Sequence, residues 1–191
     1  MAESSLDSLR QVREVEVDWR AYELHPDNAP AIPPEVEAHY RERVAAGWPR
    51  VQQIARERFG LEMRRREGEG ERRSTRLAHV GAKYAIAQGR GEAYHKAAFA
   101  AHWQALRDIS DVETLAALAR QVGLDEAGFR VALSDPEYVS QVEEDEYWAW
   151  QQQLQGVPAF IFGGRYLVSG AQPPDLLAEV VDRCLAEGRA P

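Results

Sequence analysis

The segment Gly156–Leu185 constrains the fold of this chain most strongly, because its local chemistry specifies a complete supersecondary unit. Two short apolar runs of strand-favouring residues, Ala159–Phe162 and Arg165–Val168, are separated by Gly163-Gly164. Both glycines accept the positive φ that a tight primed turn requires. The sequence therefore predicts an antiparallel hairpin with a two-residue loop.

A helix is predicted directly after this hairpin. Pro173-Pro174 fits a turn or the first turn of a helix, and Asp175 suits the positive end of the helix dipole. Apolar residues then recur at helical spacing, which gives the helix one face that packs on the hairpin. These residues are Leu177, Val180, Val181, Cys184 and Leu185.

A half-buried strand is predicted at Val15–Leu24, where apolar and charged residues alternate. The stretch from His25 to Pro34 contains four prolines and ends this strand in a loop. The polar stretch before the strand reads as the last turns of a helix, with apolar residues at Leu6, Leu9 and Val12.

Between Pro34 and Gln155 the sequence predicts helices that are interrupted by short turns. Gly47-Trp48-Pro49 is expected to divide the first of them into two helices. Arg64–Arg73 has no apolar residue to bury, so it is expected to be a solvated loop. Further helices are predicted at 74–88, 91–107, 111–121, 125–133 and 135–155, with Asp111, Asp125 and Asp135 as N-caps.

Composition limits the classes of function. A chain of 191 residues that is 45% hydrophobic can form one core, or one domain with a large insertion. Its net charge of -8 disfavours binding to nucleic acid or to an anionic membrane surface. The sequence has no run of 18 apolar residues and no signal-peptide pattern at its start, which predicts a cytoplasmic protein without a membrane span.

The segment Gly156–Pro174 resembles the tails of DsbA-family oxidoreductases of the FrnE-like group, which have the thioredoxin fold. A comparable strand in that group ends in a turn similar to the one from Trp19 to Pro26. The residues alone favour a trans bond before Pro158. The resemblance instead implies a cis-proline, and it implies that the backbone of Val157 holds extended substrate, so Val157 and Pro158 are the candidate substrate-binding residues.

The resemblance also implies an α/β fold, thioredoxin-like and of the DsbA type, with a large helical insertion. We expect residues 1–33 to form part of the thioredoxin-like unit, namely the end of its first helix plus a strand. Residues 34–155 would form the helical insertion, and residues 156–191 the hairpin and C-terminal helix of the thioredoxin-like unit.

In the family, the fold opens with a buried central strand, and a reactive cysteine pair follows it at the start of the first helix. We expect this sequence to begin inside that helix. The missing strand would lie between Val15–Leu24 and Ala159–Phe162. Each buried backbone group without a partner costs roughly 1–3 kcal/mol. We therefore expect an N-terminally truncated sequence; the alternatives are that the two strands pair with each other, or that a partner supplies the strand.

Thiol–disulfide exchange needs a thiolate of low pKa and a second cysteine to resolve the mixed disulfide. The chain has one cysteine, Cys184, late on the apolar face of the last helix, where a buried structural thiol is expected. The sequence thus predicts no catalytic residue in this chain, and redox inactivity as written.

Neither a metal site nor a cofactor is predicted. His95 and His102 share a helix face without a carboxylate at ligand spacing, and His79 has apolar neighbours. Four aromatic residues are expected to pack the insertion against the hairpin, the alternative being a hydrophobic cleft over Pro158. They are Trp103, Tyr147, Trp148 and Trp150.

Three functions follow from the resemblance. The first is a FrnE-like thiol–disulfide oxidoreductase that lacks its Cys-x-x-Cys segment, and the second is a non-catalytic module that binds extended peptide beside Val157. The third is a relative of the glutathione-dependent 2-hydroxychromene-2-carboxylate isomerases and kappa glutathione transferases, although Ser169–Gln172 lacks their acidic-basic pair. The expected partners are a polypeptide or a small thiol or disulfide, and a homodimer is a further expectation.

Overall fold

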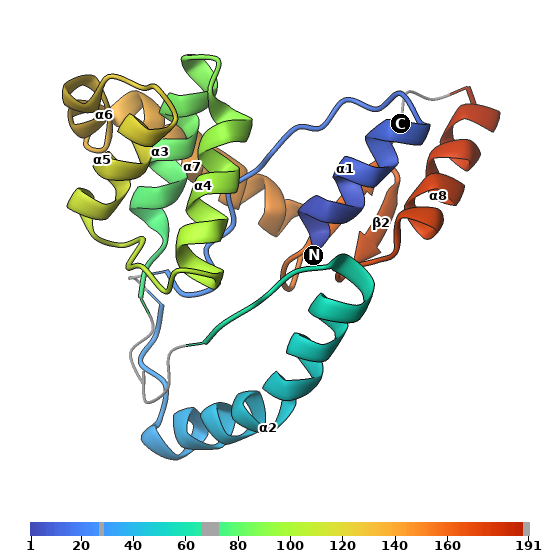
Figure 1. The fold of residues 1–191 in the computed structure, drawn as a ribbon, viewed down its shortest axis with the longest axis horizontal. Coiled ribbons are helices and arrows are strands. Elements are labelled where there is room, and N and C mark those ends of the chain that lie inside the picture. Colours follow the sequence, from blue (N-terminus) through green and yellow to red (C-terminus); the bar gives the residue numbers. More distant parts are fainter. Residues whose placement is uncertain (27–28, 66–72, 189–191) are drawn as a thin grey trace.

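The computed structural model describes residues 1–26, 29–65 and 73–188. Helices dominate it, and one hairpin forms its sheet (Figure 1). In chain order the elements are α1 (Ala2–Val12), α2 (Pro34–Phe59), α3 (Arg76–Ala87), α4 (Gly91–Trp103), α5 (Val112–Gln121), α6 (Glu126–Ala132), α7 (Pro136–Gln151), β1 (Ala159–Phe162), β2 (Tyr166–Ser169) and α8 (Pro174–Ala186).

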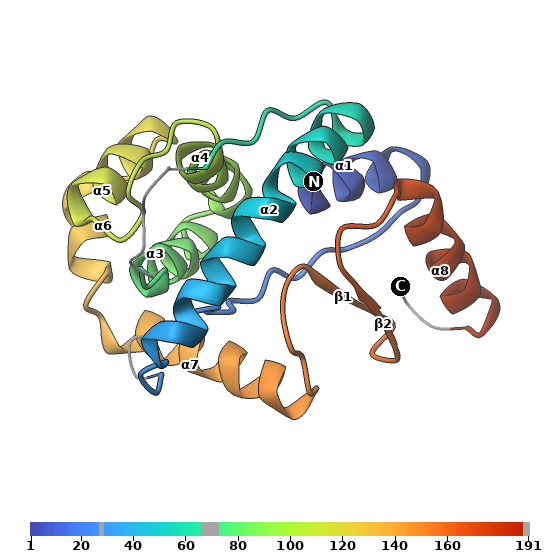
Figure 2. The ribbon, with the colours of Figure 1, turned by 90° about the horizontal axis from the view of Figure 1, so that it is seen from below.

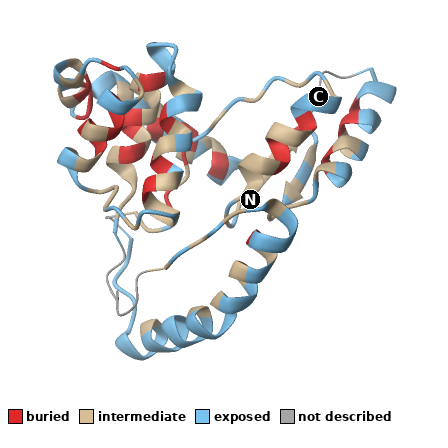
Figure 3. Cartoon of the chain, in the orientation of Figure 1, coloured by how far each residue is buried: buried red, intermediate tan, exposed pale blue. Residues whose placement is uncertain are grey.

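Helices α3 to α7 form one packed unit, which we call the helical body (Figure 1). Apolar residues from all five helices meet in its interior, and aromatic rings pack at its centre. Figure 3 shows this concentration of buried residues. The large residues of this core are Val80, Tyr94, Leu115, Phe129 and Val142.

Helices α1 and α8 pack with the hairpin in a second and smaller unit, the hairpin body. Its buried residues come from both helices and from the end of β1. Figure 2 shows α1 and α8 beside the hairpin, apart from the helical body. The cluster consists of Leu6, Leu9, Phe162, Leu177, Val181 and Cys184.

The hairpin has the predicted turn but a different loop length. Gly163 and Gly164 both have positive φ, at 55° and 65°, as a primed turn requires. The register pairs Phe162 with Tyr166, so three residues separate the strands. The prediction of two was wrong because Arg165 lies between the turn and the first paired residue of β2.

Helix α2 is a single helix of 26 residues, so the predicted break at Gly47-Trp48-Pro49 is wrong. Pro49 lies inside it, and helix-forming residues flank Gly47-Trp48-Pro49 on both sides, at Ala45-Ala46 and from Gln52 to Arg56. The helix arches past the gap between the two bodies and is mostly exposed (Figures 1 and 3). Ala55 is its buried residue.

The strand predicted at Val15–Leu24 is also wrong. Residues 14–23 run as an extended chain whose side chains alternate in burial, but they do not form a β-strand. The sheet of the described residues consists of β1 and β2 alone. The alternating pattern is present without a ladder, because none of the strands that the structure describes, β1 included, is hydrogen-bonded to this segment.

The helix ends follow local chemistry. Asp111, Asp125 and Asp135 each accept a backbone hydrogen bond as N-caps, as predicted. Helices α4 and α7 end earlier than predicted, at Trp103 and Gln151. Within the described ranges, the helices are all too short or too polar to cross a lipid bilayer.

Candidate substrate-binding site

The loop between α7 and β1 ends in a cis peptide bond between Val157 and Pro158. Helix α7 ends before this loop. Gln153 has a positive φ of 56°, and the N–H of Leu154 donates to the carbonyl of Ala149 at 3.0 Å, which together terminate the helix. The hydroxyl of Tyr22 donates to the carbonyl of Leu154 at 3.4 Å. The extended segment thus holds the loop that presents Val157, which is 46% exposed.

The backbone of β1 has one free edge among the described residues. The N–H of Gly170 donates to the carbonyl of Pro158 at 2.8 Å, which continues the ladder with β2. Hydrogen-bonded and non-hydrogen-bonded pairs alternate in an antiparallel ladder. The N–H and C=O groups of Ala159 and Ile161 therefore point away from β2, along the edge that begins at Val157.

The loop after β2 is tied to helix α1. The hydroxyl of Ser5 donates to the carbonyl of Gln172 at 2.6 Å, and the side-chain amide of Gln172 donates to the carbonyl of Ser169 at 2.8 Å. Ser5 is fully buried. These bonds fix the first turn of α1 beside the hairpin.

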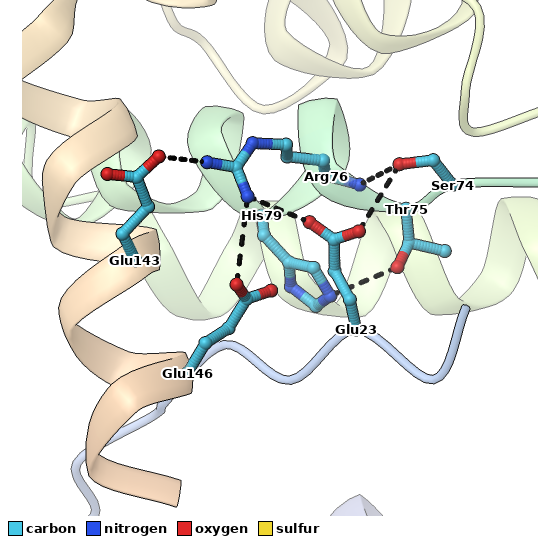
Figure 4. A network of polar contacts seen from close by, with 7 residues as sticks. All are labelled: Glu23, Ser74, Thr75, Arg76, His79, Glu143 and Glu146. Carbon is cyan, nitrogen blue, oxygen red and sulfur yellow. Dashed lines mark hydrogen bonds and ion pairs between the residues drawn. The ribbon is translucent and has the colours of Figure 1, made fainter. Parts of the chain in front are cut away.

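A partly buried polar network anchors the end of the extended segment to the helical body (Figure 4). The Glu23 carboxylate accepts from a guanidinium N–H of Arg76 and from the hydroxyl of Ser74, both at 3.3 Å. Arg76 also pairs with Glu143 at 2.6 Å and with Glu146 at 3.7 Å. One guanidinium thus joins the extended segment to α7.

Two titratable groups of this network are perturbed. Burial raises the pKa of Glu146, and the neighbouring Glu23 carboxylate raises it further. Burial lowers the pKa of His79 to about 4, and its Nε2 lies 3.2 Å from the hydroxyl of Thr75 (Figure 4). His79 is therefore a neutral, hydrogen-bonded side chain where the extended segment meets the helical body.

A second anchor lies next to this network on α7. The buried Asp145 accepts from the backbone N–H of Ala21 at 2.7 Å and lies 2.5 Å from the ammonium of Lys83. Arg20 contacts the same carboxylate at 3.3 Å. The position of Tyr22, and through it the loop before Val157, depends on these contacts.

The remaining candidate residues have structural surroundings. Cys184 is fully buried in the hairpin body, as expected for a structural thiol. His95 lies between Trp19 and Phe99, at ring distances of 4.0 and 4.5 Å, and burial lowers its pKa to about 4. His102 packs edge-on against the next ring, Trp103. The described part of the chain holds no cluster of three metal-ligating side chains.

The prediction that four aromatic residues pack the insertion against the hairpin is wrong for Trp103, Tyr147 and Trp150. The rings of Tyr147 and Trp150 are 58% and 72% exposed and stack on each other at 5.8 Å. The Arg20 guanidinium lies 4.6 Å from the ring of Trp148. Trp103 stacks on Trp48 of α2 instead of on the hairpin.

The predicted solvated loop at Arg64–Arg73 falls mostly on residues 66–72, which are outside the described ranges. At its ends, Arg64 donates its backbone N–H to the carbonyl of Trp103, and Arg73 pairs with Asp108. The interpretation of this basic segment therefore stays a prediction.

The sequence of residues 1–182 matches the profile of the DSBA-like thioredoxin domain family. The chain belongs to this family. Its fold is the predicted one, a helix-rich DsbA-like thioredoxin fold with a small sheet and a helical insertion.

Two similar proteins match nearly the whole chain. A probable DsbA oxidoreductase from Streptomyces coelicolor has 29% identity, a TM-score of 0.82, and coverage of 100% of this chain and 85% of its own. The uncharacterized protein YwbO of Bacillus subtilis is 28% identical over 170 residues, which are 88% of this chain and 82% of YwbO.

A third protein shares the fold alone. The structure of a 2-hydroxychromene-2-carboxylate isomerase superposes with a TM-score of 0.66 at 18% identity, covering 85% of this chain and 74% of its own.

Sequence reasoning missed the residues that support the site. Tyr22 and Ser5 reach their partners across 132 and 167 positions of sequence, and no local pattern signals such pairs. A weak signal existed for Asp145, which occupies an inward-facing position of α7 at helical spacing from Val142 and Ala149.

Proposed function

We propose that this chain binds an extended polypeptide along the outer edge of β1, beside Val157 and Pro158. The chain by itself would thus act as a non-catalytic module that binds extended peptide, because in a longer FrnE-like thiol–disulfide oxidoreductase the strand expected between Val15–Leu24 and Ala159–Phe162 would occupy this edge. One observation carries the proposal: Ala159 and Ile161 direct their backbone groups away from β2, toward no other described strand. Such an edge binds extended peptides through main-chain hydrogen bonds.

The surroundings of this edge favour a polypeptide. Val157 is exposed at its start, and the next alternate side chains, Ala159 and Ile161, are apolar and half-buried. An extended peptide would pair its backbone with the edge and lay apolar side chains beside these residues. The net charge of -8 disfavours nucleic acid and anionic membranes as partners.

The 191 residues themselves would bind substrate without exchanging disulfides. Their single thiol, Cys184, is buried in the hairpin body. A mixed disulfide needs an accessible thiolate to form and a second thiol to resolve it. A cytoplasmic setting completes the proposal, since a chain with one buried cysteine does not depend on an oxidising compartment.

A glutathione-dependent reaction receives no support from Ser169–Gln172. The Gln172 side chain is engaged by the carbonyl of Ser169, and no acidic-basic pair is present there.

The test compares two proline variants of the hairpin. Ile161→Pro removes an N–H from the proposed edge, and Leu167→Pro removes one from the outer edge of β2, because the two residues form a non-hydrogen-bonded pair. Binding of a fluorescein-labelled, reduced and alkylated insulin B chain is measured by anisotropy.

We expect Ile161→Pro to weaken binding on the order of tenfold, since the peptide loses the hydrogen bond from the Ile161 N–H in the middle of the edge. Leu167→Pro should bind like the parent chain. Circular dichroism verifies that both variants are folded. Equal binding by the two variants would refute the proposal, and a Val157→Gly variant replaces any proline variant that fails to fold.

A further inference from the structure

A groove on the helical body is separate from the β1 edge. It lies between the C-terminal half of α4, helix α5 and the segment that follows α2, and it holds a volume of about 580 Å³. Its floor is formed by small apolar side chains, with Leu118 beneath them. These are Ala97, Ala100, Ala101 and Ala105.

Hydrogen bonds fix the end of α4 and the segment that follows α2, which form two sides of this groove. The N–H of Arg64 donates to the carbonyl of Trp103 at 2.7 Å, and the side-chain amide of Gln52 donates to the carbonyl of Met63 at 2.9 Å. On the other side, the N–H of Arg107 donates to the carbonyl of Ala101 at 2.8 Å. The groove is thus formed before any ligand binds.

The rim of the groove carries two arginines and one glutamate, whereas the whole chain has a net charge of -8. Arg64 and Arg107 line the groove with their guanidinium groups outside the close ion pairs of the described residues, although Arg107 helps to lower the pKa of Asp111 and Arg64 helps to lower that of Glu62. The third charged lining residue, Glu62, is engaged by Arg56 at 2.9 Å. The amides of Gln104 and Gln121 complete the rim.

We propose that this groove binds a small organic carboxylate with an apolar body. The alanine floor offers apolar surface without filling the space, and the volume lies in the range of about 300–1,000 Å³ that is usual for small-molecule sites. A guanidinium fork pairs with a carboxylate through two parallel hydrogen bonds. Arg64 and Arg107 would hold the carboxylate, and the glutamine amides would fix its orientation.

The test uses three probes of equal chain length: octanoate, octanamide and octylammonium. Binding to the whole chain is measured by isothermal titration calorimetry, and chemical shifts of the backbone amides locate it. We expect saturable binding of octanoate with shifts at Ala100 and Gln104. Octanamide should bind on the order of tenfold more weakly, because it lacks the charge-assisted bonds.

Three variants locate the interaction. Arg107→Gln should weaken octanoate binding on the order of tenfold. The control Arg120→Gln makes the same change in charge on the exposed face of α5, where Arg120 pairs with Glu126, and should leave binding unchanged. Ala100→Leu should block binding by filling the floor.

The proposal is overturned if octanoate does not bind, if octanamide binds equally well, or if the two arginine variants behave alike. Circular dichroism verifies folding, and the arginine pair decides the outcome if Ala100→Leu does not fold.

Discussion

The helical body and the hairpin body satisfy their backbone polar groups in different ways. In the helical body, N–H and C=O groups pair inside each helix, and aromatic and aliphatic side chains fill one closed core. In the hairpin body, β1 pairs with β2 on one side, and its other edge faces no described strand. The backbone of the first body is paired within its helices, whereas the second leaves one edge of β1 without a partner strand among the described residues.

The extended segment at residues 14–23 connects the two bodies. Val15, Val17 and Trp19 pack against the hairpin body, while the Ala21 N–H and the Glu23 carboxylate are bound by the helical body. The segment therefore holds the two bodies in position relative to each other.

The largest effect is expected from the core of the helical body. Phe129→Ala removes a fully buried ring that packs against Tyr84 and Tyr94, and should cost about 3–5 kcal/mol of unfolding free energy. Urea denaturation followed by circular dichroism measures it. Val131→Ala, on the exposed face of α6, should stay within about 0.5 kcal/mol of the parent. Similar losses in both variants would contradict a closed core.

The next effect concerns the connection between the bodies. Asp145→Ala leaves the ammonium of Lys83 and the N–H of Ala21 without their shared partner, at a cost of roughly 3 kcal/mol. Hydrogen exchange should also show faster exchange at Ala21. Glu144→Ala, at an exposed neighbouring position of α7, is the control. An unchanged Ala21 amide in Asp145→Ala would show that the segment is held by other contacts.

Acid should destabilise the protein through two histidines. The pKa values of His79 and His95 lie at about 4 in the folded chain, below the ordinary value of 6.5. Their contribution is present above pH 6.5 and is lost as the pH falls toward 4, because the unfolded chain binds protons that the folded chain does not. The loss should reach roughly 2–3 kcal/mol for each.

Urea denaturation between pH 7 and pH 4 measures this loss. His95→Phe should flatten the dependence, whereas the exposed His39→Phe should not. Identical pH profiles of the two variants would refute the assignment.

The smallest effect on stability is expected at Glu146. Its substitution should stabilise the protein, whereas Phe129→Ala and Asp145→Ala should destabilise it. The pKa of Glu146 is raised, so stability falls as the pH rises above the ordinary value of 4.5, where the unfolded chain ionises first. Glu146→Gln should therefore raise the melting temperature at pH 7 and leave it unchanged at pH 4. The gain should be under about 1 kcal/mol, because the side chain is partly exposed and screened.

Local chemistry made part of this structure predictable. The positive φ of Gly163 and Gly164 and the N-caps Asp111, Asp125 and Asp135 depend on a few adjacent residues, and the structure has each of them. The hairpin register was missed by one residue, since no rule of turn chemistry requires Arg165 to remain unpaired.

Features that depend on distant partners were not predictable. An alternating pattern forms a strand only beside another strand, and Val15–Leu24 has the pattern without the ladder. Ser5 and Tyr22 act through partners that local periodicity does not reveal. The candidate residues Val157 and Pro158 came from family resemblance, and their role in binding stays a prediction.

Amide hydrogen exchange along β1, measured by NMR with and without the unfolded insulin B chain, tests the central claim most directly. The account predicts slow exchange at Phe160 and Phe162 and fast exchange at Ala159 and Ile161 in the free chain. Addition of the peptide should slow Ala159 and Ile161. Protection of these two amides in the free chain, or no change when the peptide binds, would contradict the account.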